Sequence, residues 1–448
     1  MRRSFAIALI VVAFWAPGAS ADEGFSGWEK KITDVKGGGE PEIAVGPNGT
    51  PLLVSFNGCG VAVSGDRGET FKVNPNDPAD PGPTPNVPYH NCSDPVSAIG
   101  PDKTLYTGAG WWDTPGGSVD YYNMYVAHSA DGGSTWSKPV FATGDRQLPQ
   151  LLLLGRNTGH SDRLFLSVDA TTNTLYASAT DFPRLVRWVV ASHDDGATFS
   201  APRAIDSNRY PQLQGEEAGD YTPAAAHGVL AYTYVASAAP HRTDCPCGIF
   251  ETSRNDGRTW KRRRTPFPAN WLAADPRHRG RFAIMSGQGV TATPASPGSI
   301  AISTTADAGR TWSKPVLLGD GTHPQIQPWI AYSPKGVLGV GYKTLYSGLQ
   351  LQPQFFANAL TGNLSATYDF WTAVSLNNGA TFSKPLRVSN AVSPPGNAAG
   401  NDDFSSVALD NRYLYAAWGD RRTSPTNPAA GPVGVYFARV PLSAYAPR

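Results

Sequence analysis

Carboxylates recur just before several strand-like segments of the sequence, in which apolar and polar residues alternate. The catalytic candidates of this kind are Asp94, Asp162, Asp220 and Asp403. Like charges that are brought together raise one another's pKa values unless a cation, a proton or a substrate compensates them. A fold that gathers these residues around one axis would therefore create a site. Each aspartate has a structural alternative, which is to accept hydrogen bonds from its own loop.

Aromatic, basic and histidine residues near these carboxylates suggest a sugar as the ligand. The substrate-binding candidates are Trp111, Trp112, His160, Arg163 and Arg421. Exposed aromatic rings stack on sugars, and the guanidinium fork suits the carboxylate of an acidic sugar. The alternative for the tryptophans is packing between structural elements.

The elements that must position these residues form a repeat. Six segments share the pattern Ser/Thr-x-Asp/Asn-x-Gly-x-Thr-aromatic, and they begin at Ser64, Ser129, Ser192, Ser253, Thr305 and Ser375. Each follows an alternating strand. The Asp or Asn suits a turn because it accepts backbone hydrogen bonds, and the Gly permits a positive φ. Six copies predict a repeat architecture made of hairpins.

Seven inner hairpins accompany these six turns. They span 42–56, 96–108, 164–180, 221–235, 271–286, 329–342 and 404–418. The seventh is followed by residues 433–440 and then by the end of the chain, whereas residues 26–32 resemble an outermost strand without its preceding turn. Pairing this N-terminal strand with the C-terminal blade would close the ring and remove its open edge. The sequence predicts an all-β propeller of seven four-stranded antiparallel blades, with six blades as the alternative.

The repeated turn is similar to the Asp-box, or BNR repeat, and residues 22–448 resemble the bacterial sialidase-like superfamily as one propeller domain. The resemblance implies that the box joins the outer two strands of each blade and is part of the scaffold. The starts of the innermost strands then surround the channel mouth on the opposite face. The carboxylates named above, together with Glu40, Glu42 and Gln327, would lie there.

The resemblance also implies a set of sialidase residues: three arginines that clamp a carboxylate, an Asp acid/base and a Tyr nucleophile activated by Glu. Tyr221, with Glu216 or Glu217, is the candidate nucleophile pair. Where the superfamily has Arg-Ile-Pro, this sequence has Glu40-Pro41-Glu42-Ile43, so the first clamp arginine is missing. We expect a glycoside hydrolase-like enzyme that acts on glycans. The alternatives are a non-catalytic glycan- or protein-binding propeller and a polysaccharide lyase, in which His160 or His323 would act with Tyr221 and Arg421.

The N-terminus predicts export. Residues 1–21 combine Arg2 and Arg3, an apolar run and small residues before a cleavage point. We therefore expect a secreted, extracellular or periplasmic protein without a membrane span, and a monomer. The formal net charge of the whole chain is +1, which gives no basis for a nucleic-acid partner. The basic run Lys261–Arg264 is interpreted as a solvated strand end.

Four cysteines in an exported protein favour disulfides. Cys59 and Cys92 fall in neighbouring loops, and we expect them to be bonded to each other. The state of Cys245 and Cys247 stays open between a mutual disulfide, reduced thiols and a soft metal. No cofactor or metal is expected, apart from a possible structural calcium near residues 74–86.

Overall fold

The computed structural model describes residues 28–35, 39–82, 91–113, 121–142, 161–181, 186–205, 223–236, 247–286, 299–321, 323, 325–346, 367–393, 405–422 and 433–446. Only the backbone is described at residues 91, 93, 112–113, 121–123, 161–163, 180–181 and 186. The predicted export segment, residues 1–21, lies outside the described residues.

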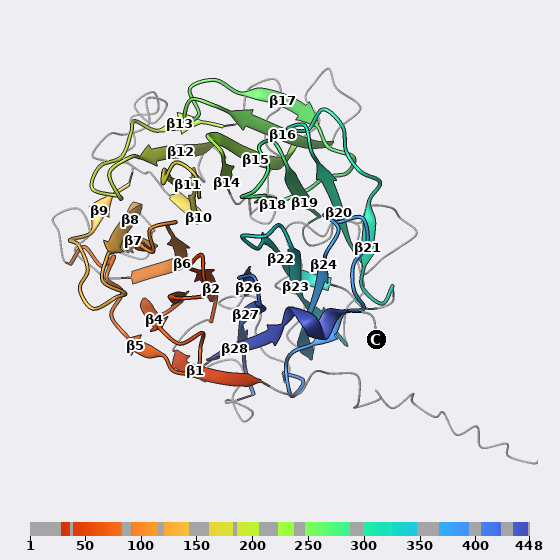
Figure 1. Cartoon of the computed structure of the whole chain (residues 1–448). Coiled ribbons are helices and arrows are strands. Elements are labelled where there is room, and N and C mark those ends of the chain that lie inside the picture. The colour runs from red at the N-terminus through yellow and green to blue at the C-terminus, as the bar shows by residue number, and fades with distance from the viewer. Residues whose placement is uncertain are drawn as a thin grey trace, which may run out of the picture.

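The described residues form seven four-stranded antiparallel sheets in a ring (Figure 1). Blades 1 to 3 consist of β2 (Glu42–Val45), β3 (Leu52–Phe56), β4 (Gly60–Ser64) and β5 (Lys72–Asn74); β6 (Asn91–Ile99), β7 (Leu105–Asp113), β8 (Tyr121–Ser129) and β9 (Val140–Phe141); and β10 (Ser161–Val168), β11 (Leu175–Asp181), β12 (Val186–Ser192) and β13 (Arg203–Ala204). In each blade the first strand is innermost. The prediction of a seven-bladed propeller is confirmed.

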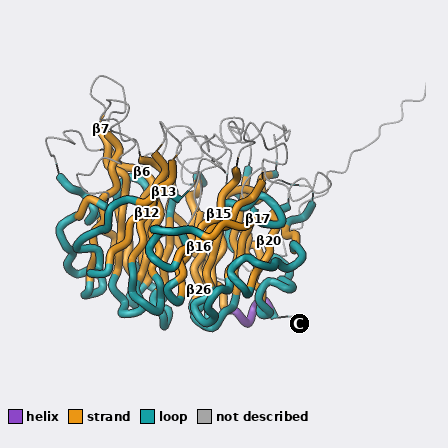
Figure 2. Tube along the Cα trace, turned by 90° about the horizontal axis from the view of Figure 1, so that it is seen from above, coloured by secondary structure: helices purple, strands orange, loops and turns teal. Residues whose placement is uncertain are grey.

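Blades 4 to 6 repeat this order. They consist of β14 (Ala224–Ala226), β15 (Val229–Ala236), β16 (Cys247–Ser253) and β17 (Lys261–Arg264); β18 (Trp271–Ala274), β19 (Phe282–Met285), β20 (Ile300–Thr305) and β21 (Val316–Leu318); and β22 (Gln325–Tyr332), β23 (Leu338–Leu345), β24 (Tyr368–Ser375) and β25 (Leu386–Arg387). Seen from the side, the strands run along the axis of the ring (Figure 2).

Blade 7 joins the two ends of the chain. It consists of β26 (Ser405–Leu409), β27 (Tyr413–Asp420), β28 (Val433–Pro441) and the N-terminal strand β1 (Glu29–Val35), and a 3-10 turn at Leu442–Tyr445 follows. Strand β1 pairs with β28 in antiparallel register from Glu29 opposite Ala438 to Val35 opposite Val433. The predicted closure is therefore confirmed: in the innermost-to-outermost order β26-β27-β28-β1, the C-terminal strand β28 is paired on both sides.

An ion-pair network fixes this closure. Arg422 donates from Nη1 to Oε1 of Glu29 at 2.8 Å and from Nη2 to Oδ2 of Asp420 at 2.6 Å. Its guanidinium also lies 4.4 Å from the centre of the Tyr436 ring. Both carboxylates are almost completely buried. The N-terminal strand is thus held by buried charge as well as by the β-ladder.

The six box turns share one hydrogen-bond pattern. In the first, the Ser64 hydroxyl donates to Oδ1 of Asp66, and both the N–H and the hydroxyl of Thr70 donate to the same carboxylate. The N–H of Gly68 donates to the Ser64 hydroxyl. These bonds, with the Thr70 hydroxyl contributing most, lower the pKa of Asp66 to about 2. The box carboxylate therefore serves the turn.

Candidate functional site at the mouth of the channel

The innermost strands of three blades begin with the same backbone irregularity. Glu40, Asp94 and Gln327 each adopt a positive φ, at 34°, 50° and 47°, and each is followed by proline. The ladder of β6 shifts register between Ser93 and Val96, and the ladder of β22 shifts between Ile326 and Trp329. A residue other than glycine is rare in this conformation, and such residues gather at functional sites. We call Glu40, Asp94 and Gln327 the mouth residues.

The mouth residues are polar and buried. Glu40 is 5%, Asp94 8% and Gln327 2% exposed. Burial of polar side chains in a strained backbone costs free energy on two counts, which the surrounding contacts must offset. The same cost at equivalent places of three blades identifies this face as the candidate site.

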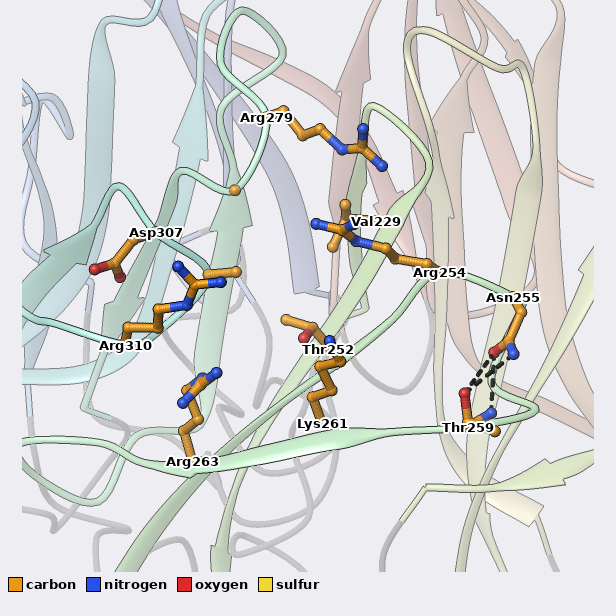
Figure 3. A pocket seen from close by; sticks show the side chains of 12 residues that line it. Val229, Thr252, Arg254, Asn255, Thr259, Lys261, Arg263, Arg279, Asp307 and Arg310 are labelled. Atoms are coloured by element: carbon orange, nitrogen blue, oxygen red, sulfur yellow. Dashed lines mark hydrogen bonds between the residues drawn. The ribbon is translucent and has the colours of Figure 1, made fainter.

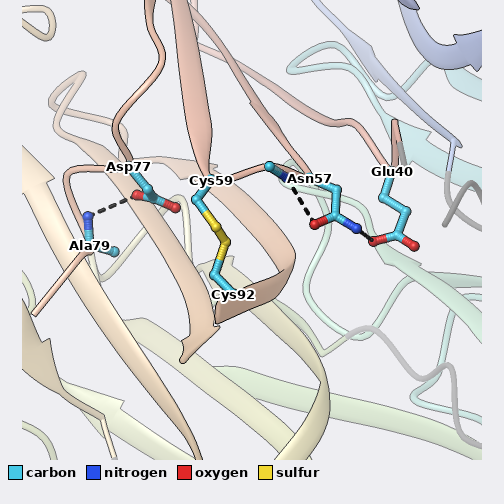
Figure 4. The surroundings of a disulfide bond; sticks show 7 residues. Glu40, Asn57, Cys59, Asp77, Ala79 and Cys92 are labelled. Carbon is cyan, nitrogen blue, oxygen red and sulfur yellow. Dashed lines mark hydrogen bonds between the residues drawn. A yellow bond between two sulfur atoms is a disulfide. The ribbon is translucent and has the colours of Figure 1, made fainter. Parts of the chain in front are cut away.

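Side chains of neighbouring strands hold Glu40 in place. Asn57, at the end of β3, donates from Nδ2 to Oε2 of Glu40 at 2.7 Å. The N–H of Asn57 in turn donates to the carbonyl of Gly39. Figure 4 shows this pair beside the disulfide that follows it in the chain. Sequence reasoning missed Asn57, and its only signal is its place two residues before a cysteine.

The disulfide between Cys59 and Cys92 joins blade 1 to blade 2 next to the mouth residues (Figure 4). The Cα atoms of the two cysteines lie 6.1 Å apart. Cys92 precedes Asp94 by two residues, and Cys59 follows Asn57 by two. The bond therefore restrains the segment that carries Asp94 and the turn whose Asn57 binds Glu40.

Trp111 packs against this disulfide. It is 3% exposed and lies in a cluster with Ala109, Cys59 and Cys92. The prediction of an exposed sugar platform is thus not met at Trp111, because its ring covers the bond between two blades. This is the packing alternative that the sequence left open.

Serines of blade 7 hold the other strained segments. The Ser406 hydroxyl donates to the carbonyl of Pro41 at 3.0 Å and accepts the N–H of Ile43 at 2.8 Å. The Ser405 hydroxyl donates to the carbonyl of Gln327 at 2.9 Å. Each contact crosses from one blade to the next. They explain how the strained backbone at two mouth residues is kept, and nothing in the sequence pattern marks these serines.

Glu42 lies one step deeper, on the wall of the channel. Burial raises its pKa well above the usual value, and a hydrogen bond from the backbone of Ser97 offsets this only in part. The side chain lines a central cavity whose other walls are largely apolar.

Three aromatic rings meet inside the channel at this level. Phe165, Trp271 and Trp329 come from blades 3, 5 and 6, and their ring centres lie 4.8 to 6.2 Å apart. Because blades 3 and 6 are not neighbours, the contact between Phe165 and Trp329 crosses the axis. A cavity of about 490 Å³, which Trp329 helps to line, extends to turns between the first and second strands of several blades. A ligand that enters from the mouth would therefore face these rings.

A second polar cluster lies at the same end of blade 6. Asp369 accepts hydrogen bonds from the Tyr346 hydroxyl at 2.7 Å and the Trp371 Nε1 at 2.5 Å, and it pairs with Arg387 at 2.8 Å. His323 stacks edge-on against Tyr346 and pairs with Asp320. Burial, and then the charge of Asp369, raises the pKa of Tyr346.

The described tyrosines do not include one with the environment of a nucleophile. Every resolved shift among the described tyrosines is upward, with burial as the main cause, as in Tyr106, Tyr232 and Tyr436. A tyrosine nucleophile needs the opposite environment, one that favours the phenolate. The candidate for that role, Tyr221, lies outside the described residues.

Blade 7 separates the roles of two adjacent arginines. Arg422 belongs to the closure described above. Arg421 is 3% exposed, and its N–H donates to the Ser393 hydroxyl at 3.0 Å. The expected carboxylate-binding arginine is therefore buried in the wall and not presented on an open surface.

The remaining predicted site residues are described in part or not at all. For Asp162, Arg163 and Trp112 only the backbone is described, in β10 and β7. His160, Asp220, Tyr221 and Asp403 lie outside the described residues. Asp94 is placed beside the disulfide at the mouth, as given above. Cys247 is also disulfide-bonded, and Cys245 lies outside the described residues.

The described part of the chain lacks two further features. No group of three or more His, Cys, Asp or Glu side chains is arranged there to hold a metal ion. In the same residues, no helix has the length and apolar character to cross a membrane.

Comparisons with known proteins add the following. No family model matches the chain, and no curated protein matches it. Among solved structures, a sialidase described as Hadza microbial sialidase Hz136 is 17% identical with a TM-score of 0.46, covering 89% of this chain and 74% of its own.

Two other similar solved structures are an arabinanase and a complex with a peptide. The α-L-arabinanase of Penicillium chrysogenum complexed with arabinobiose is 13% identical with a TM-score of 0.44, covering 82% of this chain and 97% of its own. YCF48 bound to D1 peptide is 11% identical with a TM-score of 0.46, covering 94% and 97%. At these scores the likenesses carry no argument about function.

Proposed function

We propose that this chain is a secreted carbohydrate-active propeller that binds a glycan at the channel mouth and hydrolyses it with carboxyl groups. The observation that carries the proposal is the set of mouth residues. Three strained, buried polar side chains stand at equivalent places of three blades, near a cluster of aromatic rings in the channel. A propeller that needed only its fold would gain stability by losing this strain.

Asp94 is the described residue to which we assign acid or base chemistry. Glycoside hydrolysis uses one carboxylic acid that protonates the leaving oxygen and one carboxylate that acts as base or nucleophile. Burial and the restraint of the disulfide hold Asp94 at the mouth. We assign the second carboxylate to Asp162, Asp220 or Asp403. Tyr221 remains the candidate for a tyrosine nucleophile.

The alternative is a propeller that binds a glycan or a protein without turnover. The burial of Trp111 and Arg421 favours it, because neither the stacking platform nor the arginine clamp is open among the described residues.

Export is part of the proposal. The apolar N-terminal segment with its small residues supports it, and disulfides persist in oxidising compartments. Expression of the chain with its own first 21 residues tests this. A mature N-terminus near Asp22 in the medium or periplasm is expected, and retention of Met1 in the cytoplasm would contradict it.

The function is tested by incubating the purified chain with sialosides, arabinans and acidic polysaccharides. The products are followed as reducing ends, free sialic acid and unsaturated uronates. Hydrolysis supports the proposal, and unsaturated products would assign a lyase. Tight binding of one glycan without any product would support the binding alternative. If the chain neither binds any of these glycans nor releases a product, both the enzyme hypothesis and the binding hypothesis are refuted.

A further inference from the structure

A second concave site lies on the other face of the molecule, between the box turns of blades 4 and 5. Its volume is about 360 Å³. Its basic lining residues are Arg254, Lys261, Arg263, Arg279 and Arg310, and Figure 3 shows them extending from separate segments into one space. We call this cavity with its five basic residues the basic pocket.

Strand alternation explains two of the five. Successive side chains of β17 point to opposite sides, so Lys261 and Arg263 share one side. Arg262 lies on the other side, where its Nε donates to the buried carboxylate of Glu251. The run Lys261–Arg264 is therefore more than a solvated strand end, because Lys261 and Arg263 line the pocket whereas Arg262 pairs with a buried carboxylate.

The basic pocket has little negative charge of its own. Within the described residues, none of its five cations forms an ion pair. Asp307 lines the pocket, but its Oδ1 accepts the Thr311 N–H and its Oδ2 the Thr311 hydroxyl. Five like charges within one small pocket repel one another, and a bound anion would relieve that repulsion.

The scaffold does not require these charges. The Arg254 position of the box is uncharged in four other turns, which have Gly65, Ala130, Ala306 and Leu376. The Arg310 position is uncharged in three, which have Ser134, Ala197 and Ala380. The turn folds with small or apolar residues at both places. The positive charge is thus particular to this pair of blades.

We propose that the basic pocket binds the sulfate or carboxylate groups of an acidic polysaccharide. Guanidinium forks match these planar or tetrahedral oxyanions in a bidentate manner. A nucleic acid fits less well, because no described lining residue is aromatic and single strands are held largely by stacking on aromatic rings. The pocket lies on the face opposite the mouth, so it acts as an anchoring site apart from any chemistry there.

Calorimetric titration with a heparin hexasaccharide tests the proposal, and hexagalacturonate tests carboxylates alone. The first variant is Arg263→Gln/Arg310→Gln. The matched control is Lys72→Gln/Lys138→Gln, which removes two exposed charges that follow other boxes. We expect the first variant to bind at least tenfold more weakly and the control to stay within twofold. Added salt should weaken binding to the wild type.

Three results would overturn the proposal: equal losses in both double variants, no binding of either hexasaccharide, or tighter binding of a DNA oligomer of equal charge. If the first variant does not fold, Lys261→Gln/Arg279→Gln replaces it, with the same expectation. Asp94→Asn, which tests the channel mouth, should bind heparin as the wild type does. Failure here is therefore distinguishable from failure of the proposed function.

Discussion

At the scale of single residues, Glu42 shows how burial in the channel wall raises the pKa of a carboxyl group. Its folded pKa is raised by burial, whereas its unfolded pKa is about 4.3. The stability that the protonated group contributes is complete below the unfolded pKa and is lost as the pH rises through the folded value.

Glu42→Gln should therefore change the pH dependence of stability. Gln can accept the same backbone hydrogen bond without ionising. We expect thermal unfolding of the two proteins to differ little at pH 4, and the variant to gain several degrees over the wild type by pH 8. Asp34→Asn, an exposed carboxylate on β1, is the control. A difference that does not change with pH would contradict a buried titrating Glu42.

The box turn makes the opposite prediction for acid. The pKa of Asp66 is lowered to about 2 in the fold, so its contribution is present above the unfolded value of about 3.9 and is lost as the pH falls to 2. Asp66→Ala should lower the midpoint of thermal unfolding by a few degrees at pH 7. Asp66→Asn should do so by less, because Asn255 and Asn377 already serve in two boxes.

At the scale of elements, the Cys59–Cys92 disulfide supports the mouth. Cys59→Ser/Cys92→Ser should lower the free energy of unfolding by roughly 2–4 kcal/mol. It should also weaken glycan binding at the mouth, because Asn57 and Asp94 each lie two residues from a lost restraint. Chemical denaturation and glycan titration measure the two effects. Lower stability with unchanged glycan binding would show that the bond serves the fold alone.

The elements also show what the sequence predicts and what it does not. Strand alternation and the count of inner hairpins predicted seven blades, because each blade needs its own inner pair to bury an apolar face. The positive φ at Glu40, Asp94 and Gln327 was not predicted, since a residue before proline is expected to be extended. The shared X-Pro pair at one place in the repeat was the available signal.

The sequence also did not predict which single side chains are buried. Trp111 packs on the disulfide between blades 1 and 2, and its residue type and place in the strand pattern would equally allow an exposed ring. Arg421 and Arg422 are adjacent and have the same residue type, but among the described contacts it is Arg422 that binds Glu29 across the blade 7 closure.

At the scale of the whole molecule, the closure of blade 7 holds the ring together. Arg422→Gln would leave Glu29 and Asp420 buried without their shared cation. Breaking such a network costs roughly 3–5 kcal/mol. Urea unfolding should show this loss, whereas Lys31→Ala, which removes an exposed pair on the same strand, should cost about 0–1 kcal/mol. Equal effects of the two changes would mean that the β-ladder alone closes the ring.

Asp94→Asn is the most direct test of the proposed chemistry at the channel mouth. Asn tolerates the positive φ at this position, so the backbone should stay as it is. With the glycan that the wild type hydrolyses, we predict that kcat/KM falls at least 100-fold in Asp94→Asn. The thermal midpoint should change little, and Asp66→Asn should keep wild-type turnover. Unchanged turnover in Asp94→Asn, or no turnover of any tested glycan by the wild type, would contradict hydrolysis at the mouth by Asp94.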